Sequence, residues 1–387
     1  MVLLLIAGLS ASRPLAAQTA TLAAPAAVLS PTPGEREKTT TVPDTAAVKA
    51  LIKEGTALHD QGKYDAAIDK YRAALKLDPD SVDAMYEMAY SQYARLDLKT
   101  SLATASEAAK RPSPLRSALY GLIGNIYDDL KEPAKAIEAY QAGLRENPNL
   151  GLLHFNLGVT YRRLNVLPKA RASFQNGLSL EPNRASSHYW LGRTYMEQGY
   201  RVPAILALSR FLVLEPASQR SKVALDWIDE IFHAEVKTDT KGNSQLTVLE
   251  IQKDEGDFTA ANLMISLLQA SEKLPTEADE KPEAPFEVKR LADLFSVVAE
   301  TRSEAKGMGF AETYYVPYFV GLKEGSWTET FAYYILQSGK TADVEKWLAT
   351  NRHVIDRMLR WSSGFKWNSA KSPGSAPEPR PAEKEEK

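Results

Sequence analysis

The chain contains no cysteine among its 387 residues. This absence excludes disulfide bonds, thiolate metal sites, iron–sulfur clusters, a catalytic cysteine and a lipid anchor on cysteine. An excess of one charge is also absent, because 47 Lys and Arg residues face 49 Asp and Glu residues, for a formal net charge of -2. That balance argues against broad electrostatic attachment to nucleic acid or to a membrane surface.

Common catalytic motifs are missing as well. The sequence has no G-x-S-x-G, no G-x-x-x-x-G-K-[ST], no G-x-G-x-x-G and no H-E-x-x-H. Only 5 His residues are present as candidate general bases. We therefore expect a protein that is not an enzyme and that uses no cofactor and no metal. The alternative is an enzyme whose C-terminal domain is catalytic while the rest of the chain recruits substrate.

The N-terminus carries an apolar run at residues 2–9, with the sequence VLLLIAGL. A membrane-spanning helix needs about 20 apolar residues, so this run is too short to span a bilayer. Its length suits the core of a secretory signal peptide, and Ala17 before Gln18 suits a cleavage site. We expect residues 1–17 to be a signal peptide and the mature chain to be periplasmic or associated with the cell envelope. A cytoplasmic location is the alternative, because no Lys or Arg precedes the run.

An internal repeat runs through residues 48–218. Pro148, Pro182 and Pro216 are spaced 34 residues apart and close the last three units. An earlier unit over residues 82–116 has one extra residue and lacks a closing proline in register. The units at 151 and 185 share a pattern of large and small apolar residues: Leu157, Gly158, Tyr161, Ala170 and Phe174 in one, and Leu191, Gly192, Tyr195, Ala204 and Leu208 in the other.

This pattern resembles the tetratricopeptide repeat (TPR), which has a period of 34 residues and the signature W-x2-L-G-x2-Y…A-x3-F…P. The resemblance implies an all-α solenoid of about five repeats, each a pair of antiparallel helices, with residues 219–233 as a capping helix. Small residues at repeat positions 8 and 20 would let the two helices approach closely. The related pentatricopeptide repeat binds RNA, but the closing prolines and the near-neutral charge favour the TPR interpretation. We expect no nucleic-acid partner.

The resemblance also implies a concave groove, lined by positions 2, 5, 9 and 12 of the first helix in each repeat. Aromatic anchors beside arginines are typical of protein interfaces. We therefore expect a peptide or protein partner with some acidic character. The alternative is that the aromatic residues pack between helices and the arginines are solvated. The predicted groove residues are Tyr86, Tyr90, Tyr93, Asn125, Asp128, Phe155, Asn156, Arg162, Tyr189, Arg193 and Met196.

Some TPR proteins bind a C-terminal carboxylate with two asparagines and three cations. Asn125 and Asn156 match the asparagines, but Gly121, Ser186 and Trp190 stand where the cations are needed. Without those charges a carboxylate would lose its hydration with little compensation. We expect no such carboxylate clamp.

His154 and His188 share repeat position 4, which normally holds a large core residue. We therefore expect these two histidines to pack in the core rather than to bind a metal.

The C-terminal region has helical periodicity at residues 257–271, 286–304 and 342–361. Nine aromatic residues fall between 310 and 334, and we expect them to form the core of a small helical domain; a second binding surface is the alternative. Ser326 and Glu329 have the spacing of a capping box, which predicts a helix start. The acidic linker 272–285 could fold into the groove at Arg162 and Arg193 and regulate it.

The expected domain organisation follows from these segments. Residues 18–46 form a flexible linker rich in Ala, Thr and Pro, and residues 367–387 form a disordered tail. Between them we expect a TPR solenoid over 47–236 and a helical C-terminal domain over 257–366. Residues 237–256 form a linker that has room for one short strand.

Overall fold

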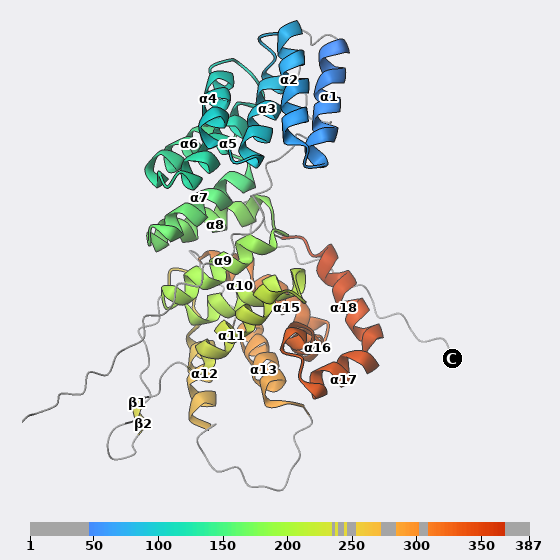
Figure 1. Cartoon of the computed structure of the whole chain (residues 1–387). Coiled ribbons are helices and arrows are strands. Elements are labelled where there is room, and N and C mark those ends of the chain that lie inside the picture. The colour runs from blue at the N-terminus through green and yellow to red at the C-terminus, as the bar shows by residue number, and fades with distance from the viewer. Residues whose placement is uncertain are drawn as a thin grey trace, which may run out of the picture. The chain divides into compact units, whose positions relative to one another are not determined.

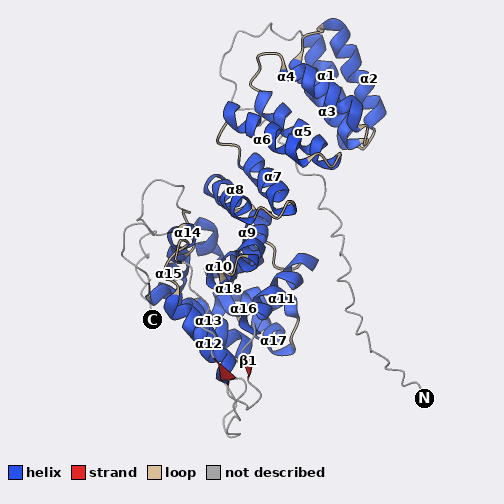
Figure 2. Cartoon of the chain, turned by 90° about the vertical axis from the view of Figure 1, so that its left-hand side faces the viewer, coloured by secondary structure: helices blue, strands red, loops and turns tan. Residues whose placement is uncertain are grey.

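The computed structural model describes residues 46–233, 237–238, 244–245, 253–271, 284–301 and 309–367, which are almost entirely helical (Figures 1 and 2). The predicted signal peptide, the linker up to residue 45, the acidic stretch 272–283 and the tail from residue 368 lie outside the described residues. The chain divides into two compact units, Met1–Ile126 and Tyr127–Lys387. Each unit is described by itself below.

The first unit holds the helix pairs of repeats one and two. Helix α1 (Ala46–Asp60) packs against α2 (Tyr64–Leu77), and α3 (Val82–Ala94) packs against α2 and α4 (Leu98–Ala109). Helix α5 (Arg116–Asp129) opens the third repeat and contains the boundary between the two units.

The second unit continues the repeats in the same manner. Each helix from α6 to α11 packs against the next helix in the chain, as stacked two-helix repeats require. The bounds are α6 (Pro133–Glu146), α7 (Gly151–Arg163), α8 (Leu167–Leu180), α9 (Ala185–Glu197), α10 (Arg201–Leu214) and α11 (Gln219–His233).

The turn between the two helices of each repeat has one conformation throughout the described repeats. One residue in each turn has a positive φ, and the next amide donates back to a carbonyl five residues earlier, as Val166 does to Tyr161 at 2.9 Å. The positive-φ residues are Gly62, Leu96, Lys131, Asn165 and Gly199, at successive spacings of 34, 35, 34 and 34 residues. The predicted five repeats, and the extra residue in the second one, are thereby confirmed.

Glycine at repeat position 8 sets the separation of the two helices. A Cβ atom added at Gly158 would lie 2.7 Å from the ring of Phe174, and one at Gly192 would lie 2.6 Å from Leu208 Cγ. Each glycine therefore leaves the space that the large residue of the second helix fills. The role predicted for position 8 is confirmed by these contacts.

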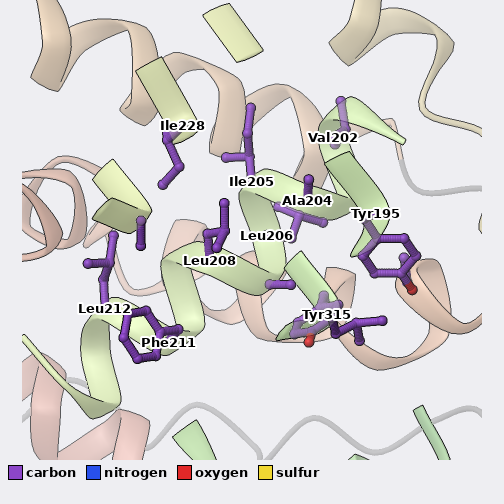
Figure 3. Close-up of a cluster of buried hydrophobic side chains, with 14 of the residues drawn as sticks. Tyr195, Val202, Ala204, Ile205, Leu206, Leu208, Phe211, Leu212, Ile228 and Tyr315 are labelled. Carbon is purple, nitrogen blue, oxygen red and sulfur yellow. The ribbon is translucent and has the colours of Figure 1, made fainter. Parts of the chain in front are cut away.

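Helix α10 differs from the other second helices because it is buried on every side. All residues from Val202 to Leu212 are buried, so the helix has no polar face. It contacts α9 and α11 of the solenoid and also α12 and α16 of the C-terminal region. Figure 3 shows this core, where Tyr315 lies in the same cluster as Leu206, Leu208 and Phe211.

The C-terminal helices therefore share a compact unit with the later repeats, and the units differ from the expected division between 47–236 and 257–366. The physical reason is that the C-terminal helices shield the outer apolar side chains of α10 from water. Their bounds are α12 (Thr259–Ser271), α13 (Phe286–Glu300), α14 (Phe310–Tyr314), α15 (Val316–Glu324), α16 (Thr328–Ile335), the 3₁₀ helix η1 (Leu336–Gly339), α17 (Ala342–Thr350) and α18 (Arg352–Gly364).

The helix start predicted near Ser326 is confirmed, because α16 begins at Thr328, but the capping box is wrong. Ser326 has a φ of 56° and its amide donates to Lys323 at 2.9 Å, so it closes the turn after α15. Trp327 is the residue before α16, and no side chain caps that helix. A serine in a left-handed turn conformation cannot also adopt the extended backbone of an N-cap.

A short hairpin lies in the segment where a strand was expected. Strands β1 (Lys237–Thr238) and β2 (Ser244–Gln245) pair in antiparallel orientation, with Lys237 opposite Gln245. Residues 246–251 of the same segment lie outside the described residues.

An acidic segment, Lys253–Phe258, joins the repeats to the C-terminal helices. Glu255 is 3% exposed and accepts hydrogen bonds from Gln175 at 2.7 Å and from the Tyr195 hydroxyl at 2.8 Å, both in repeats four and five. The same carboxylate accepts the amide of Ala311 in α14 at 3.0 Å. A buried carboxylate needs such partners to offset its lost hydration.

Its neighbour Asp254 adds two contacts with the repeats. Tyr200 donates to this carboxylate at 2.8 Å, and Arg171 forms an ion pair with it at 2.9 Å. The end of the predicted linker 237–256 is therefore docked on repeats four and five.

None of the described helices combines the length and the apolar character that crossing a lipid bilayer requires. Apart from the short hairpin, the described residues form a solenoid of two-helix repeats followed by a C-terminal helical region, as the sequence predicts.

Replacing Gly309 by Ala should break the docking of the acidic segment. A Cβ atom there would lie 2.1 Å from the backbone oxygen of Asp254 and 2.2 Å from Glu255 Cα, and backbone atoms cannot give way cheaply. We expect a loss of roughly 2–3 kcal/mol in the free energy of unfolding and faster amide hydrogen exchange in the acidic segment. Gly364→Ala is the control, since no atom lies within 4 Å of its added Cβ. Equal stability of the two variants would contradict the proposed close contact.

Candidate functional site

The first helices of repeats four and five, α7 and α9, lie side by side, with α11 next to α9 (Figure 1). Two arginines on them lie over tryptophan rings. The guanidinium carbon of Arg162 is 4.6 Å from the ring centroid of Trp190, and that of Arg193 is 4.8 Å from Trp227. All four side chains are partly exposed. We call these four residues the arginine–tryptophan surface.

One carboxylate holds both arginines of this surface. Glu197 Oε1 lies 2.6 Å from Arg162 Nη2 and 2.8 Å from Arg193 Nε. Met196 borders the same group, with its sulfur 3.6 Å from Arg193 Nη1. The planar cations are thereby fixed both by ring stacking and by an ion pair.

Aromatic residues extend the surface on both sides. Arg184 lies 5.7 Å from the ring of Phe155 and pairs with Glu181 at 2.6 Å. Tyr189 is buried beneath the tryptophans, with its ring centroid 4.9 Å from that of Trp227. Burial raises the pKa of Tyr189, and the nearby arginines oppose that rise in part.

The structure places the predicted groove residues in two groups. Those that are partly exposed are Tyr90, Asp128, Phe155, Arg162, Arg193 and Met196. Those that are buried are Tyr86, Tyr93, Asn125, Asn156 and Tyr189, at 2%, 8%, 7%, 6% and 7% exposure. Neighbouring helices enclose the buried residues. For the buried tyrosines this agrees with the alternative interpretation, in which the aromatic residues pack between helices.

Two residues of the arginine–tryptophan surface, Trp190 and Trp227, were not predicted for the groove, and neither was Glu197, which pairs with its arginines. Trp190 stands at a position where a carboxylate clamp would need a cation, and the groove prediction did not include it. Trp227 lies at position 9 when the repeat numbering is continued into the capping helix, so that extension would have found it. Glu197 has no comparable signal, because its role depends on contacts with arginines from two helices.

The face of the first unit on α1 and α3 is aromatic and acidic rather than basic. The ring of Tyr90 stacks on His59 at 4.9 Å, and His59 Nδ1 lies 2.8 Å from the hydroxyl of Ser91. Burial, followed by the charges of Asp83 and Asp60, raises the pKa of Glu87 to about 7. The rings of the first unit therefore lie beside a carboxyl group with a raised pKa, whereas those of the second unit lie beside arginines.

Two further arginines of repeat four are paired with carboxylates of this chain. Arg163 pairs with Asp128, itself a predicted groove residue, and Asp128 also accepts a hydrogen bond from Thr160 at 3.1 Å. Arg171 pairs with Asp254 and Glu255. The net positive charge of repeat four is therefore much smaller in the fold than in the sequence.

The two histidines at repeat position 4 have a structural role. His154 Nε2 lies 3.2 Å from the carbonyl of Pro148, and His188 Nε2 lies 2.9 Å from that of Pro182. His188 is fully buried, and its Nδ1 also bonds to the Tyr315 hydroxyl at 2.8 Å. Each histidine thus satisfies the carbonyl of the closing proline of the preceding repeat, which cannot bond within a helix.

Among the described residues, no three or more His, Asp and Glu side chains are grouped so that they could hold a metal ion. The two asparagines considered for a carboxylate clamp, Asn125 and Asn156, are both buried.

The C-terminal aromatic residues form a packed core. Tyr315, Tyr318, Phe319 and Phe331 are fully buried, and Phe295 of α13 packs 4.8 Å from Phe319. Dense packing of this kind supports the interpretation of these residues as a structural core.

Comparison with known proteins agrees with the repeat assignment. A model described as TPR repeat matches residues 55–94, and a model described as tetratricopeptide repeat matches residues 117–150. A search of curated proteins finds no match. Together with the turn register, these matches show that the chain carries tetratricopeptide repeats, and such repeats support a protein-interaction scaffold.

Solved TPR structures align with about half of the chain. TTC0263, a TPR protein from Thermus thermophilus, is 23% identical, with a TM-score of 0.40, covering 47% of this chain and 99% of its own. YrrB, described as a TPR protein with an unusual peptide-binding site, is 20% identical, with a TM-score of 0.38, covering 48% and 100%. PilF of Pseudomonas aeruginosa is 20% identical, with a TM-score of 0.40, covering 48% and 89%.

The buried histidine predicts an acid-sensitive fold. Burial and the nearby Arg210 lower the pKa of His188 to about 3, so the unfolded chain binds a proton from about pH 6.5 downward that the folded chain excludes. We expect the free energy of unfolding to fall by roughly 3 kcal/mol from this residue between pH 7.5 and 4. Urea unfolding of His188→Gln, which cannot titrate, should show a smaller decrease. Histidine NMR signals showing that His188 titrates near pH 6.5 would contradict the prediction.

Proposed function

We propose that this protein is a non-catalytic scaffold that binds a peptide or protein partner on the first-helix faces of its repeats. The observation that carries the proposal is the arginine–tryptophan surface of α7, α9 and α11. There, the partly exposed rings of Trp190 and Trp227 pack against the core on one side and each lie beside an arginine guanidinium group. Tryptophan and arginine are the residues that most often dominate binding energy at protein interfaces.

The packing beneath the surface supports binding to a preformed site. Tyr189 lies 5.1 Å from Trp190 and 4.9 Å from Trp227 by ring centroid, and Phe211 supports it from α10 at 4.9 Å. The exposed rings are therefore held in place before a partner arrives. A rigid anchor loses little conformational entropy on binding, which favours affinity.

Substituting the exposed rings should abolish partner binding. A chain beginning at Gln18 is immobilised and incubated with a cell-envelope extract, and captured proteins are identified by mass spectrometry. Trp190→Ala combined with Trp227→Ala should lower the recovery of a specific partner strongly, since loss of about 2 kcal/mol per hot spot weakens affinity about 30-fold.

The matched control combines Leu263→Ala with Leu267→Ala, which removes exposed apolar side chains from α12. Circular dichroism should show that both variants keep their helical content. A partner that is recovered equally by wild type and by the tryptophan variant would contradict binding at this surface.

We also propose that the protein is exported and acts in the periplasm or at the cell envelope. The apolar run 2–9 and the small residues before Gln18 support this location. N-terminal sequencing of the protein isolated from its native cells should yield a chain that begins at Gln18. A chain that retains Met1 or Val2 in the cytoplasmic fraction would overturn export.

A further inference from the structure

Two guanidinium groups on the arginine–tryptophan surface share a single carboxylate oxygen. Arg162 reaches Glu197 Oε1 from α7 at 2.6 Å, and Arg193 reaches the same atom from one turn earlier on α9 at 2.8 Å. Two positive charges thus face one negative charge, and the cluster keeps a net charge of about +1. A single carboxylate cannot use all the donors of two guanidinium groups, since each group carries five.

The cluster is accessible and its geometry is fixed. The side chains of Arg162, Arg193 and Glu197 are 22%, 27% and 27% exposed. Trp190 and Trp227 hold the two guanidinium planes at 4.6 and 4.8 Å. Planar cations fixed in this way suit a second carboxylate, which arginine binds through paired hydrogen bonds.

The ion pairs of neighbouring arginines differ from this arrangement. Arg184 has its own carboxylate in Glu181, and Arg220 has its own in Glu215, each in one-to-one pairing. In contrast to these two neighbours, Arg162 and Arg193 share the one carboxylate of Glu197.

We propose that Glu197 occupies the place of a partner carboxylate, so that the surface recognises an Asp or Glu side chain flanked by apolar residues and Glu197 limits its affinity. The inference rests on the proposed function, because it names the chemical class of partner for the same surface. An incoming carboxylate takes over donors of Arg162 and Arg193, while the tryptophan rings contact the flanking apolar side chains. Displacement is feasible because exposed ion pairs are weak.

The test uses two blocked, fluorescently labelled nonapeptides: one alternates Phe and Glu, and the other has Gln in place of every Glu. Binding to the full chain is measured by fluorescence polarisation for wild type and for Glu197→Gln, which removes the charge and keeps the shape. The matched control is Glu345→Gln on α17, an exposed residue that changes the net charge by the same amount.

We expect Glu197→Gln to bind the Glu peptide about three- to fivefold more tightly than wild type, the change that loss of a weak competing ion pair gives. Its affinity for the Gln peptide should equal that of wild type, and Glu345→Gln should match wild type for both peptides. Arg162→Lys combined with Arg193→Lys keeps the charge but loses the planar donors, and it should erase the preference for the Glu peptide.

Several results would overturn the inference. Equal affinities of Glu197→Gln and Glu345→Gln for the Glu peptide, or a gain shared by both peptides, would do so. If binding still depended on Trp190 and Trp227 in that case, the proposed function would stand. Failure of wild type and of every variant to bind either peptide would count against both.

Discussion

Helix α10 has no polar face, so it is stable only when apolar side chains cover it on both sides. One side is the ordinary seam of a two-helix repeat, where α9 packs through the close approach at Gly192. The other side would face water in a plain solenoid, and here α12 and α16 cover it. This requirement joins the C-terminal region to the last repeats in one compact unit.

Polar contacts then fix how the two regions meet. Glu255 is buried between repeat and C-terminal groups, and its hydrogen bonds to Gln175, Tyr195 and Ala311 come from three separate elements. A buried carboxylate is costly unless every partner is in place, so these contacts specify one arrangement among the many that apolar burial alone would allow. Gly309 permits that arrangement because its missing side chain leaves room for the backbone of Asp254.

The arginine–tryptophan surface lies on α7, α9 and α11, and its four side chains are partly exposed. Its aromatic rings lie on a buried layer formed by Tyr189 and Phe211, and its cations are held by ring faces and by Glu197. Beside the rings of the first unit lies Glu87, whose pKa burial raises to about 7, so the two units carry surfaces of different chemistry on one chain. A scaffold with such surfaces can distinguish partners by charge as well as by shape.

The sequence alone determined the repeat architecture, because the closing prolines and the small residues at position 8 act through neighbours a fixed distance away in the chain. The same locality explains why Phe155, Arg162 and Arg193 could be placed on an exposed face by counting positions. The tertiary structure alone decided that Asp254 and Glu255 dock on the repeats, that Glu197 joins two arginines, and that Tyr189 is buried. These outcomes depend on contacts between elements that are distant in the sequence. The composition of a polar linker or of a charged helix end does not indicate which element it will contact.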